Sequence, residues 1–404
     1  MDTHKILYNY FFIACALLTS LSFPFSSSLN TPVNPPESSH SSPGPAPSTP
    51  QPPLPPPMPS PVPPSRGVKG GYWPSWLAEK NPPSTIPTKY FTHLFYAFVS
   101  LNASTYQLSI TQFDDQWMSN FTATLHDDAK NNPRPAKAFL SIGGGLSSSY
   151  TLSNMAKTTQ NRSTFVSSTS QVARKYSFDG LDLDWEFPKN EQEMSNLALL
   201  FKQWRAAVEF ESELYGKPRL LLSAAVYFSP EFFLSDVPRI YPGVSIRSYV
   251  DFVNQMCYDY HGSWDTSVTG EHALVYSNSN RITTSYGVDS WAFQEVPPEK
   301  LVISLPLYGR TWKLKDPKQN GVGAPAVGRT TTWDLANDAT LVYVEYSIAM
   351  YSYARTDWIG YDGPISIRKK IEYAKHEGLG RYFLWALGYD KNWTLSTSSA
   401  WDGR

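Results

Sequence analysis

Short runs of apolar residues recur between residues 68 and 387 of this 404-residue chain. Each run has the length of one buried strand, and most are separated by segments with the apolar periodicity of an amphipathic helix, such as 193–215 and 366–376. The expected strands span residues 68–73, 93–99, 137–142, 178–187, 219–226, 249–258, 301–307 and 381–387. Strand–helix alternation repeated eight times predicts an α/β fold, the (β/α)8 TIM barrel.

The interval between the seventh and eighth expected strands is too long for a single crossover helix. The helical segment 366–376 accounts only for its last part. We therefore expect a small inserted α+β lobe, at about 311–361, which would wall one side of a cleft.

The expected fourth strand carries four acids, Asp179, Asp182, Asp184 and Glu186, among apolar residues. Side chains alternate along an extended chain, so the last three acids share one face and the apolar residues between them share the other. Neighbouring carboxylates raise one another's pKa and are costly to bury without a function. A calcium loop needs a more flexible, glycine-rich backbone. The pattern favours a catalytic array, and the opposite parity of Asp179 predicts a structural role at the strand entry.

Reactive residues of a (β/α)8 barrel lie at the C-terminal ends of its strands, where Glu186 is expected. Polar or aromatic residues occupy the matching place on other strands. Each alone could be a core or turn residue, but together they would converge on one mouth. These residues are Tyr72, Phe98, Ser141 with the following Gly143 and Gly144, Tyr258, Asp259, Tyr308, Arg310 and Trp385.

The N-terminal part of the chain has a different composition. Residues 1–28 read as a signal peptide, because Lys5 precedes an apolar run that ends before a serine-rich stretch. Residues 29–66 form a Pro/Ser-rich linker with too few bulky apolar residues to build a core, so we expect it to be disordered and extended. Residues 67–404 are the expected catalytic barrel. Cleavage of the signal would leave one cysteine, Cys257, and no intramolecular disulfide.

Charge and aromatic content limit the classes of partner that we expect this protein to bind. The formal net charge of −1 argues against nucleic acid or an anionic membrane. The 13 tryptophans and 25 tyrosines fit a carbohydrate-handling surface. We expect a secreted monomer that has no membrane contact after signal cleavage and is delivered to the cell wall or apoplast, with the vacuole as an alternative. The glycosylation sequons at Asn102, Asn120, Asn161 and Asn392 suit that route.

The motifs at the strand ends resemble those of glycoside hydrolase family 18, the chitinase-like barrels. The likeness covers about residues 67–404 and is strongest to plant class V chitinases. It is carried by the acidic motif Asp179-x-x-Asp182-x-Asp184-x-Glu186, by Ser141-Ile-Gly-Gly144, by Met256-Cys-Tyr-Asp259, by Leu305-Pro-Leu-Tyr-Gly-Arg310 and by Trp385.

The resemblance implies substrate-assisted, retaining hydrolysis of β-1,4-linked N-acetylglucosamine, with no cofactor or metal. Glu186 would be the general acid, its pKa raised by Asp184 and partial burial. Asp184 would orient the acetamido group, Asp182 would share a proton with Asp184, and Tyr258 would bond the acetamido carbonyl. Trp385 would form the floor under the reacting sugar, and the resemblance also places Asp259, Tyr308, Arg310, Tyr72, Phe98 and Met256 at the substrate.

The same resemblance leaves a second interpretation open, a non-catalytic chitooligosaccharide-binding lectin or inhibitor, because such relatives keep the barrel. The presence of all four acids favours the enzyme. The sequence does not distinguish polymeric chitin, a lipochitooligosaccharide or an N-glycan core as the substrate. Gly145 and Leu146 follow the glycine pair where many relatives with deep clefts have an aromatic residue, so we expect a shallower leaving-group side.

Overall fold

The computed structural model describes residues 67–130, 132–234, 237–262, 264–330 and 339–400. The predicted signal peptide and linker lie outside the described residues.

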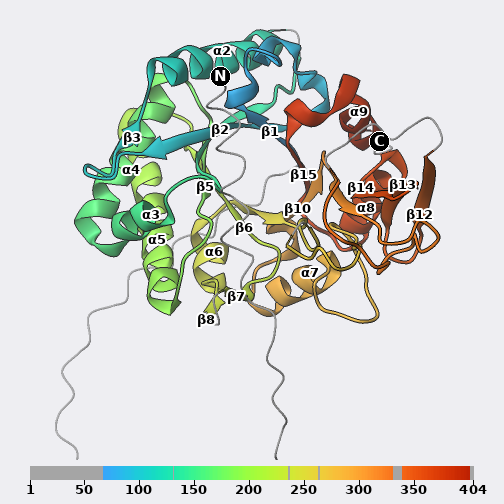
Figure 1. The fold of residues 1–404 in the computed structure, drawn as a ribbon. Helices are drawn as coiled ribbons and strands as arrows, with labels where there is room; N and C mark the ends of the chain where they lie inside the picture. The colour runs from blue at the N-terminus through green and yellow to red at the C-terminus, as the bar shows by residue number, and fades with distance from the viewer. Residues whose placement is uncertain (1–66, 131, 235–236, 263, 331–338, 401–404) are drawn as a thin grey trace, which may run out of the picture.

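Eight parallel strands close into a barrel (Figure 1). Their order around the barrel is β1-β15-β10-β9-β6-β5-β4-β2, and pairing of β1 with β2 closes the ring. The strands are β1 (Val68–Pro74), β2 (His93–Leu101), β4 (Lys137–Gly143), β5 (Gly180–Asp184), β6 (Leu221–Tyr227), β9 (Phe252–Met256), β10 (Leu301–Pro306) and β15 (Arg381–Trp385). All eight expected strands are therefore confirmed. The fourth is shorter than expected, because it ends at Asp184.

Helices surround the barrel (Figure 1). They are α2 (Gln112–Ala129), α3 (Ser149–Lys157), α4 (Thr159–Lys175), α5 (Glu191–Tyr215), α6 (Gly243–Tyr249), α7 (Thr284–Phe293), α8 (Pro364–His376) and α9 (Thr394–Ala400). The helix expected at 193–215 is α5, which begins where the Asn190 side chain accepts a hydrogen bond from the Glu193 amide and ends at Gly216 in the left-handed region. Within the described ranges, no helix has the length and apolarity needed to cross a membrane.

Alternation along β5 divides its side chains between two environments. Leu181, Leu183 and Trp185 pack in the large core between the strands and the helices. The interior of the barrel has its own core, rich in aromatic residues, which includes Tyr72, Phe95, Phe139, Phe252 and Phe383. The acidic face of β5 therefore points into the barrel, as predicted.

Two antiparallel additions flank the barrel strands. β3 (Leu108–Ser109) pairs with the end of β2, and β7 (Glu231–Leu234) pairs with β8 (Val237–Ile240) in a hairpin after β6.

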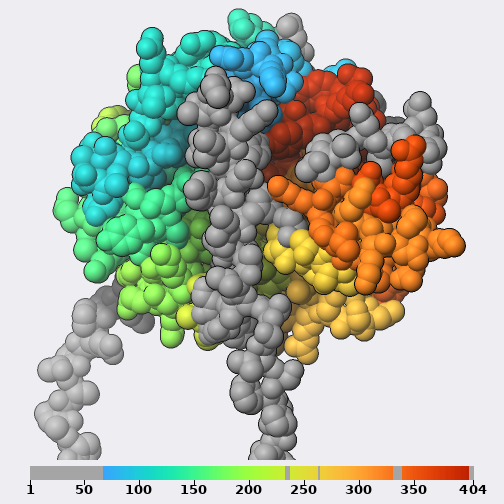
Figure 2. All heavy atoms as spheres, viewed as in Figure 1, coloured from blue at the N-terminus to red at the C-terminus, as the bar shows by residue number. Residues whose placement is uncertain are grey.

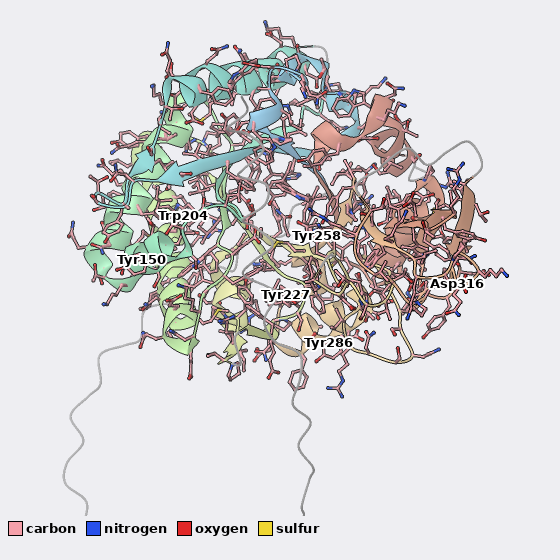
Figure 3. The ribbon with its side chains drawn as sticks, in the orientation of Figure 1. Tyr150, Trp204, Tyr227, Tyr258, Tyr286 and Asp316 are labelled. Carbon is pink, nitrogen blue, oxygen red and sulfur yellow. The ribbon has the colours of Figure 1, made fainter. Side chains whose placement is uncertain are left out.

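The predicted insertion between the seventh and eighth barrel strands is a four-stranded antiparallel sheet. Its strands are β11 (Arg310–Lys313), β12 (Thr340–Val344), β13 (Ala349–Ala354) and β14 (Asp357–Tyr361), in the order β11-β14-β13-β12. Trp312, Tyr351 and Trp358 form its small core. The lobe is prominent at one side of the molecule, where Asp316 lies (Figures 2 and 3). Its described residues, 311–330 and 339–361, contain no helix, so the helical part of the expected α+β lobe is not found in them.

Candidate active site

Asp182 is held at the centre of a layer of polar side chains inside the barrel. Strand register places Ser141 of β4 and Ser223 of β6 directly beside it. The Ser141 hydroxyl donates to Asp182 Oδ2 at 2.7 Å, and the Ser223 hydroxyl donates to Oδ1 at 2.6 Å. The Tyr72 hydroxyl donates to Oδ2 at 2.9 Å and accepts from the Asn254 amide at 2.8 Å. Burial raises the pKa of Asp182, and the three donated hydrogen bonds oppose that shift.

Asp179 has the structural role predicted from its parity. Its carboxylate accepts a hydrogen bond from the Ala138 amide at 2.8 Å, which ties the entry of β5 to the start of β4. It takes no part in the interior layer.

Asp184 ends β5 one layer closer to the mouth and is 5% exposed. Its pKa is raised well above the usual value by burial, then by the charges of Glu186 and Asp182. Its Oδ1 atom has no hydrogen-bond partner in the described part of the chain. An unpaired buried carboxylate oxygen is costly, so this atom is ready to accept a hydrogen bond from a ligand. No hydrogen bond joins it to Asp182 among the described side chains, and the predicted shared proton is not seen in this conformation.

Glu186 follows the end of β5 and is half-buried, so it keeps access to solvent. Burial raises the pKa of Glu186 to about 7, and the charge of Asp259 adds to the shift. The raised pKa agrees with the prediction for a general acid. Burial is the first cause, as predicted, and the charge of Asp259 is a cause that was not predicted. The predicted interaction with Asp184 is seen in the pKa of Asp184, which the charge of Glu186 raises.

Asp259 is fixed by an ion pair at the end of the sixth barrel strand. Arg310 donates from Nε to Oδ1 at 2.7 Å, and its Nη2 lies 2.5 Å from Oδ2. The Tyr308 hydroxyl donates to Oδ1 at 2.8 Å. Burial alone would raise the pKa of Asp259, but His272 and Arg310 outweigh it and lower the pKa to about 2. The three predicted residues Asp259, Tyr308 and Arg310 therefore form one cluster in which Asp259 stays ionised, and the charge of Asp259 acts on Glu186.

Tyr258 and Met256 lie at the end of β9. Tyr258 is half-buried, and Figure 3 shows it near the centre of the molecule, within the ring of strands. Its ring centroid is 6.0 Å from that of Tyr308. Met256 is buried, and it lies two residues after Asn254, whose side chain faces the barrel interior. Cys257, between them, packs in the outer core, so the thiol points away from the mouth as predicted.

Aromatic rings cover the opposite wall. The Trp385 ring lies 5.7 Å from Phe98 and 5.6 Å from Tyr72, measured between centroids. Trp76 stacks on Phe98 at 6.1 Å and remains 48% exposed. The structure thus brings three predicted aromatic residues together and adds Trp76, an exposed ring face of the kind that stacks on sugars.

Gly143 and Gly144 form the turn that follows β4, both with positive φ, +113° and +84°. A Cβ atom on Gly143 would lie 2.0 Å from the carbonyl oxygen of Asp184, and one on Gly144 would lie 2.5 Å from the Phe98 ring. The Gly144 amide donates to that Asp184 carbonyl at 2.8 Å. Glycine is needed at both positions, because Gly143 packs against the end of β5 and Gly144 packs against Phe98 of β2.

Sequence analysis missed four contributors: Ser223, Asn254, His272 and Trp76. Ser223 and Asn254 are polar residues at inward positions of mainly apolar strands, a signal that could have found them once the parity of each strand was known. His272 lies in a loop and Trp76 in a single 3-10 turn after β1 (Ser75–Leu77), where periodicity gives no indication.

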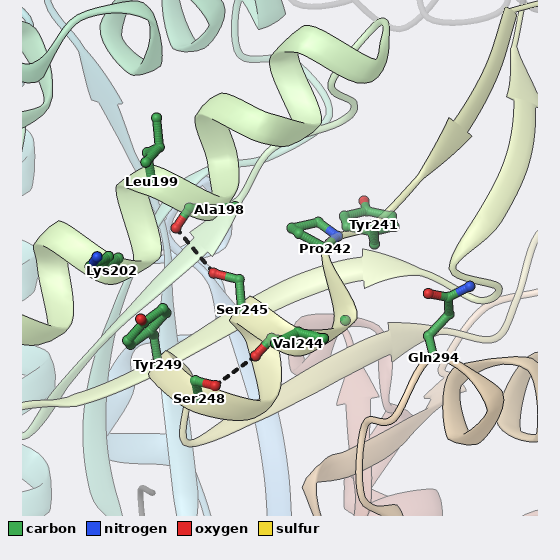
Figure 4. A pocket seen from close by; sticks show the side chains of 11 residues that line it. Ala198, Leu199, Lys202, Tyr241, Pro242, Val244, Ser245, Ser248, Tyr249 and Gln294 are labelled. Atoms are coloured by element: carbon green, nitrogen blue, oxygen red, sulfur yellow. Dashed lines mark hydrogen bonds between the residues drawn. The ribbon is translucent and has the colours of Figure 1, made fainter. Parts of the chain in front are cut away.

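The described residues contain a separate hollow of about 510 Å³ on the outside of the barrel (Figure 4). It lies between α5 and α6, where the Ser245 hydroxyl donates to the carbonyl of Ala198 at 3.0 Å. None of the predicted site residues lines it. No group of His, Cys, Asp and Glu residues in the described ranges has a metal-binding arrangement.

Comparison with known proteins identifies the family of this chain. Residues 69–390 match the family described as glycosyl hydrolases family 18, and the chain belongs to that family. It is 45% identical over 353 residues to class V chitinase CHIT5a of Medicago truncatula, which covers 83% of this chain and 90% of the relative. The resemblance to plant class V chitinases is thereby confirmed.

Two solved structures illustrate the range of similar proteins. A mutant class V chitinase from Nicotiana tobaccum in complex with NAG4 superposes with a TM-score of 0.77 at 35% identity, covering 83% of this chain and 98% of that one. The chitinase-like agglutinin RobpsCRA from Robinia pseudoacacia superposes with a TM-score of 0.75 at 37% identity, covering 82% of this chain and 98% of that one. Proteins similar to this barrel thus include one named as a chitinase and one named as an agglutinin.

Proposed function

We propose that this protein is a secreted chitinase that hydrolyses β-1,4-linked N-acetylglucosamine chains by substrate-assisted, retaining catalysis. The observation that carries the proposal is the pair at the end of β5. Glu186 has a pKa of about 7 and access to solvent, and Asp184 beside it is buried with an unpaired carboxylate oxygen.

Glu186 is the proposed general acid. A carboxyl group with a pKa near 7 holds its proton at the mildly acidic pH where an ordinary glutamate is ionised. It would give that proton to the glycosidic oxygen as the bond to the leaving sugar breaks. The carboxylate then takes a proton from the incoming water, so one residue serves both halves of the reaction.

The nucleophile in this proposal is the substrate's own 2-acetamido oxygen, which attacks C1. Asp184 Oδ1 would accept the acetamido N–H, which gives this unpaired buried atom its missing partner. An ionised Asp184 would stabilise the positive oxazolinium intermediate, whose charge opposes the burial and the neighbouring carboxylates that raise the pKa of Asp184. The Tyr258 hydroxyl, in the same mouth, would donate to the acetamido carbonyl oxygen. Attack from one face and then the other gives retention of configuration.

Trp385 would carry the reacting sugar. Its ring, backed by Phe98 and Tyr72, offers an apolar surface for the C–H face of a pyranose. Trp76 extends that surface outward. A row of rings along one wall supports a chain of several sugars as the substrate.

The second candidate function is a chitooligosaccharide-binding lectin, and the likeness to an agglutinin favours it. The intact acidic array favours the enzyme, because a lectin has no need of a glutamate with a raised pKa. Secretion, N-glycosylation and a monomeric state remain proposals that rest on the sequence.

The test measures release of products from N-acetylglucosamine tetramer and hexamer by the purified protein and by Glu186→Gln. Tryptophan fluorescence gives oligomer affinity in parallel. We expect hydrolysis by the wild type, a loss of 10³-fold or more in Glu186→Gln, and similar affinity for both. Binding by both proteins without cleavage by either would establish the lectin and refute the enzyme.

A further inference from the structure

His272 occupies a fixed position directly behind the Asp259 cluster. It is 2% exposed and lies in the loop between β9 and α7. Its backbone carbonyl accepts a hydrogen bond from the Tyr260 amide at 3.0 Å, so the loop is tied to the end of the sixth barrel strand. The carbonyl of the next residue, Ala273, accepts from the buried ammonium of Lys370 on α8. The loop is therefore held from both sides.

The imidazole ring of His272 points at Asp259. Its Nδ1 atom lies 3.8 Å from Asp259 Oδ1, and its ring lies 5.3 Å from the Tyr308 ring. Neither ring nitrogen has a hydrogen-bond partner among the described residues. An unpaired buried polar atom is destabilising, so an unsatisfied imidazole in this position needs an explanation.

The other charged groups around this loop are already engaged. Glu271 accepts a hydrogen bond from the Ser347 hydroxyl at 2.5 Å, and Lys370 pairs with Asp362 at 2.5 Å. His261 lies 3.7 Å from Asp265. Arg310 is paired with both oxygens of Asp259, and one of them, Oδ1, is the oxygen that His272 approaches. Asp259 is therefore the acceptor that the His272 ring faces.

We propose that His272 is a positioning residue of the active site, which holds the Asp259 carboxylate beside Glu186 through its ring N–H. The proposal deepens the proposed hydrolase function and rests on it. Asp259 Oδ1 already accepts hydrogen bonds from Arg310 and Tyr308, and His272 would be a third donor to the same oxygen. A displacement of about 1 Å converts the observed separation into an ordinary N–H···O hydrogen bond.

The contact between His272 and Asp259 should affect the pKa of Glu186, the proposed general acid. The negative charge of Asp259 contributes to the raised pKa of Glu186. A positive N–H dipole from His272 offsets part of that charge. Removing the donor should raise the pKa of Glu186 further and leave Asp259 less well fixed.

Two substitutions separate this role from simple packing. His272→Phe keeps a flat ring but removes both nitrogens. In His272→Asn the amide nitrogen can take the place of Nδ1. His93 provides the matched control: it is 4% exposed, it also has an unpaired ring nitrogen, and it lies at the start of β2, away from the mouth. His93→Phe should cost stability without affecting the acid.

The experiment titrates Glu186 by ¹³C NMR in glutamate-labelled protein, assigned with Glu186→Gln, and measures kcat and KM on chitotetraose across pH. For His272→Phe we expect the Glu186 pKa to rise by several tenths of a unit and kcat to fall about 10- to 100-fold with little change in KM. In His272→Asn the Glu186 pKa and kcat should both lie close to the wild-type values, and His93→Phe should match the wild type.

The proposal is overturned if His272→Phe titrates and turns over like the wild type, or if His272→Asn is as impaired as His272→Phe. The NMR titration does not need hydrolysis. Suppose that the wild type cleaves no oligomer, while His272→Phe shifts the Glu186 pKa and the other two variants do not. The proposed hydrolase function then fails, and the contact of His272 with Asp259 stands.

Discussion

The Tyr72 hydroxyl donates to the Asp182 carboxylate at 2.9 Å across the interior of the barrel, between residues 110 positions apart in the chain. Together with Ser141 and Ser223 it gives Asp182 three donors, in a layer that is closed to water. Asp182 is thereby a fixed carboxyl group beneath Asp184.

Tyr72→Phe should remove one of these donors, raise the pKa of Asp182 and lower kcat by roughly tenfold. The free energy of unfolding should fall by about 1–2 kcal/mol, since Asn254 loses its acceptor as well. Tyr96→Phe is the matched control, because the Tyr96 hydroxyl donates to Asp114 at 3.3 Å, far from the acidic layer. Equal losses of kcat in the two variants would refute a specific role for Tyr72.

The pH dependence of kcat/KM should report Glu186. Its pKa of about 7 keeps it protonated, and active as an acid, below that pH. Above it, kcat/KM should fall about tenfold per pH unit. A descending limb centred near 4.5, the ordinary value for glutamate, would show that burial and Asp259 do not act on Glu186 as described.

The same pKa predicts a change in stability when Glu186 is neutralised. Between pH 4.5 and about 7 the folded protein holds a proton that the unfolded chain releases, so Glu186 makes the fold less stable as pH rises. Glu186→Gln removes that effect. Urea unfolding should show the variant more stable than the wild type by up to about 3 kcal/mol at pH 8, with no such gain at pH 4. A difference that is the same at both pH values would contradict the assignment.

Gly143→Ala should damage the site through the backbone. The added Cβ would meet the Asp184 carbonyl at 2.0 Å, at a φ of +113°. We expect a loss of about 2–4 kcal/mol in unfolding free energy and severe loss of activity. Gly216→Ala is the control, since Gly216 also has positive φ but open space around it, and should cost about 1 kcal/mol with activity retained. An active, stable Gly143→Ala would show that the turn is not required.

The Cys257 thiol should be inert in the folded protein. It is 2% exposed, and burial raises its pKa to about 11. We expect no labelling by a disulfide reagent at pH 8 without denaturant, and complete labelling in urea. Rapid labelling of the folded protein would place the thiol at an accessible surface.

Much of this site could be predicted from the sequence, because many of its residues lie on strands whose side chains alternate between two faces. Alternation along β5 was enough to place Asp182 and Asp184 inside the barrel and the intervening leucines outside. The same rule did not apply at Tyr258 and Asp259, which are neighbours yet both line the mouth. The φ of +59° at Asp259 breaks the alternation there, and a sequence gives no direct sign of it.

Other features depend on contacts between distant segments. The donors to Asp182 come from three other strands whose register is set by the closed barrel. His272 reaches Asp259 from a loop, and Asp259 in turn contributes to the pKa of Glu186. The insertion was expected from the length of the interval, but length alone could not distinguish its antiparallel sheet from a mixed lobe.

The most direct test of the account is the anomeric form of the first products. Chitohexaose is mixed with the purified protein in an NMR tube, and the anomeric protons of the new reducing ends are followed before mutarotation. Prompt appearance of the β-anomer is the predicted result, because the acetamido oxygen and then water attack opposite faces of C1. Prompt α-anomer, or no product while the oligomer binds, would contradict substrate-assisted hydrolysis at Glu186.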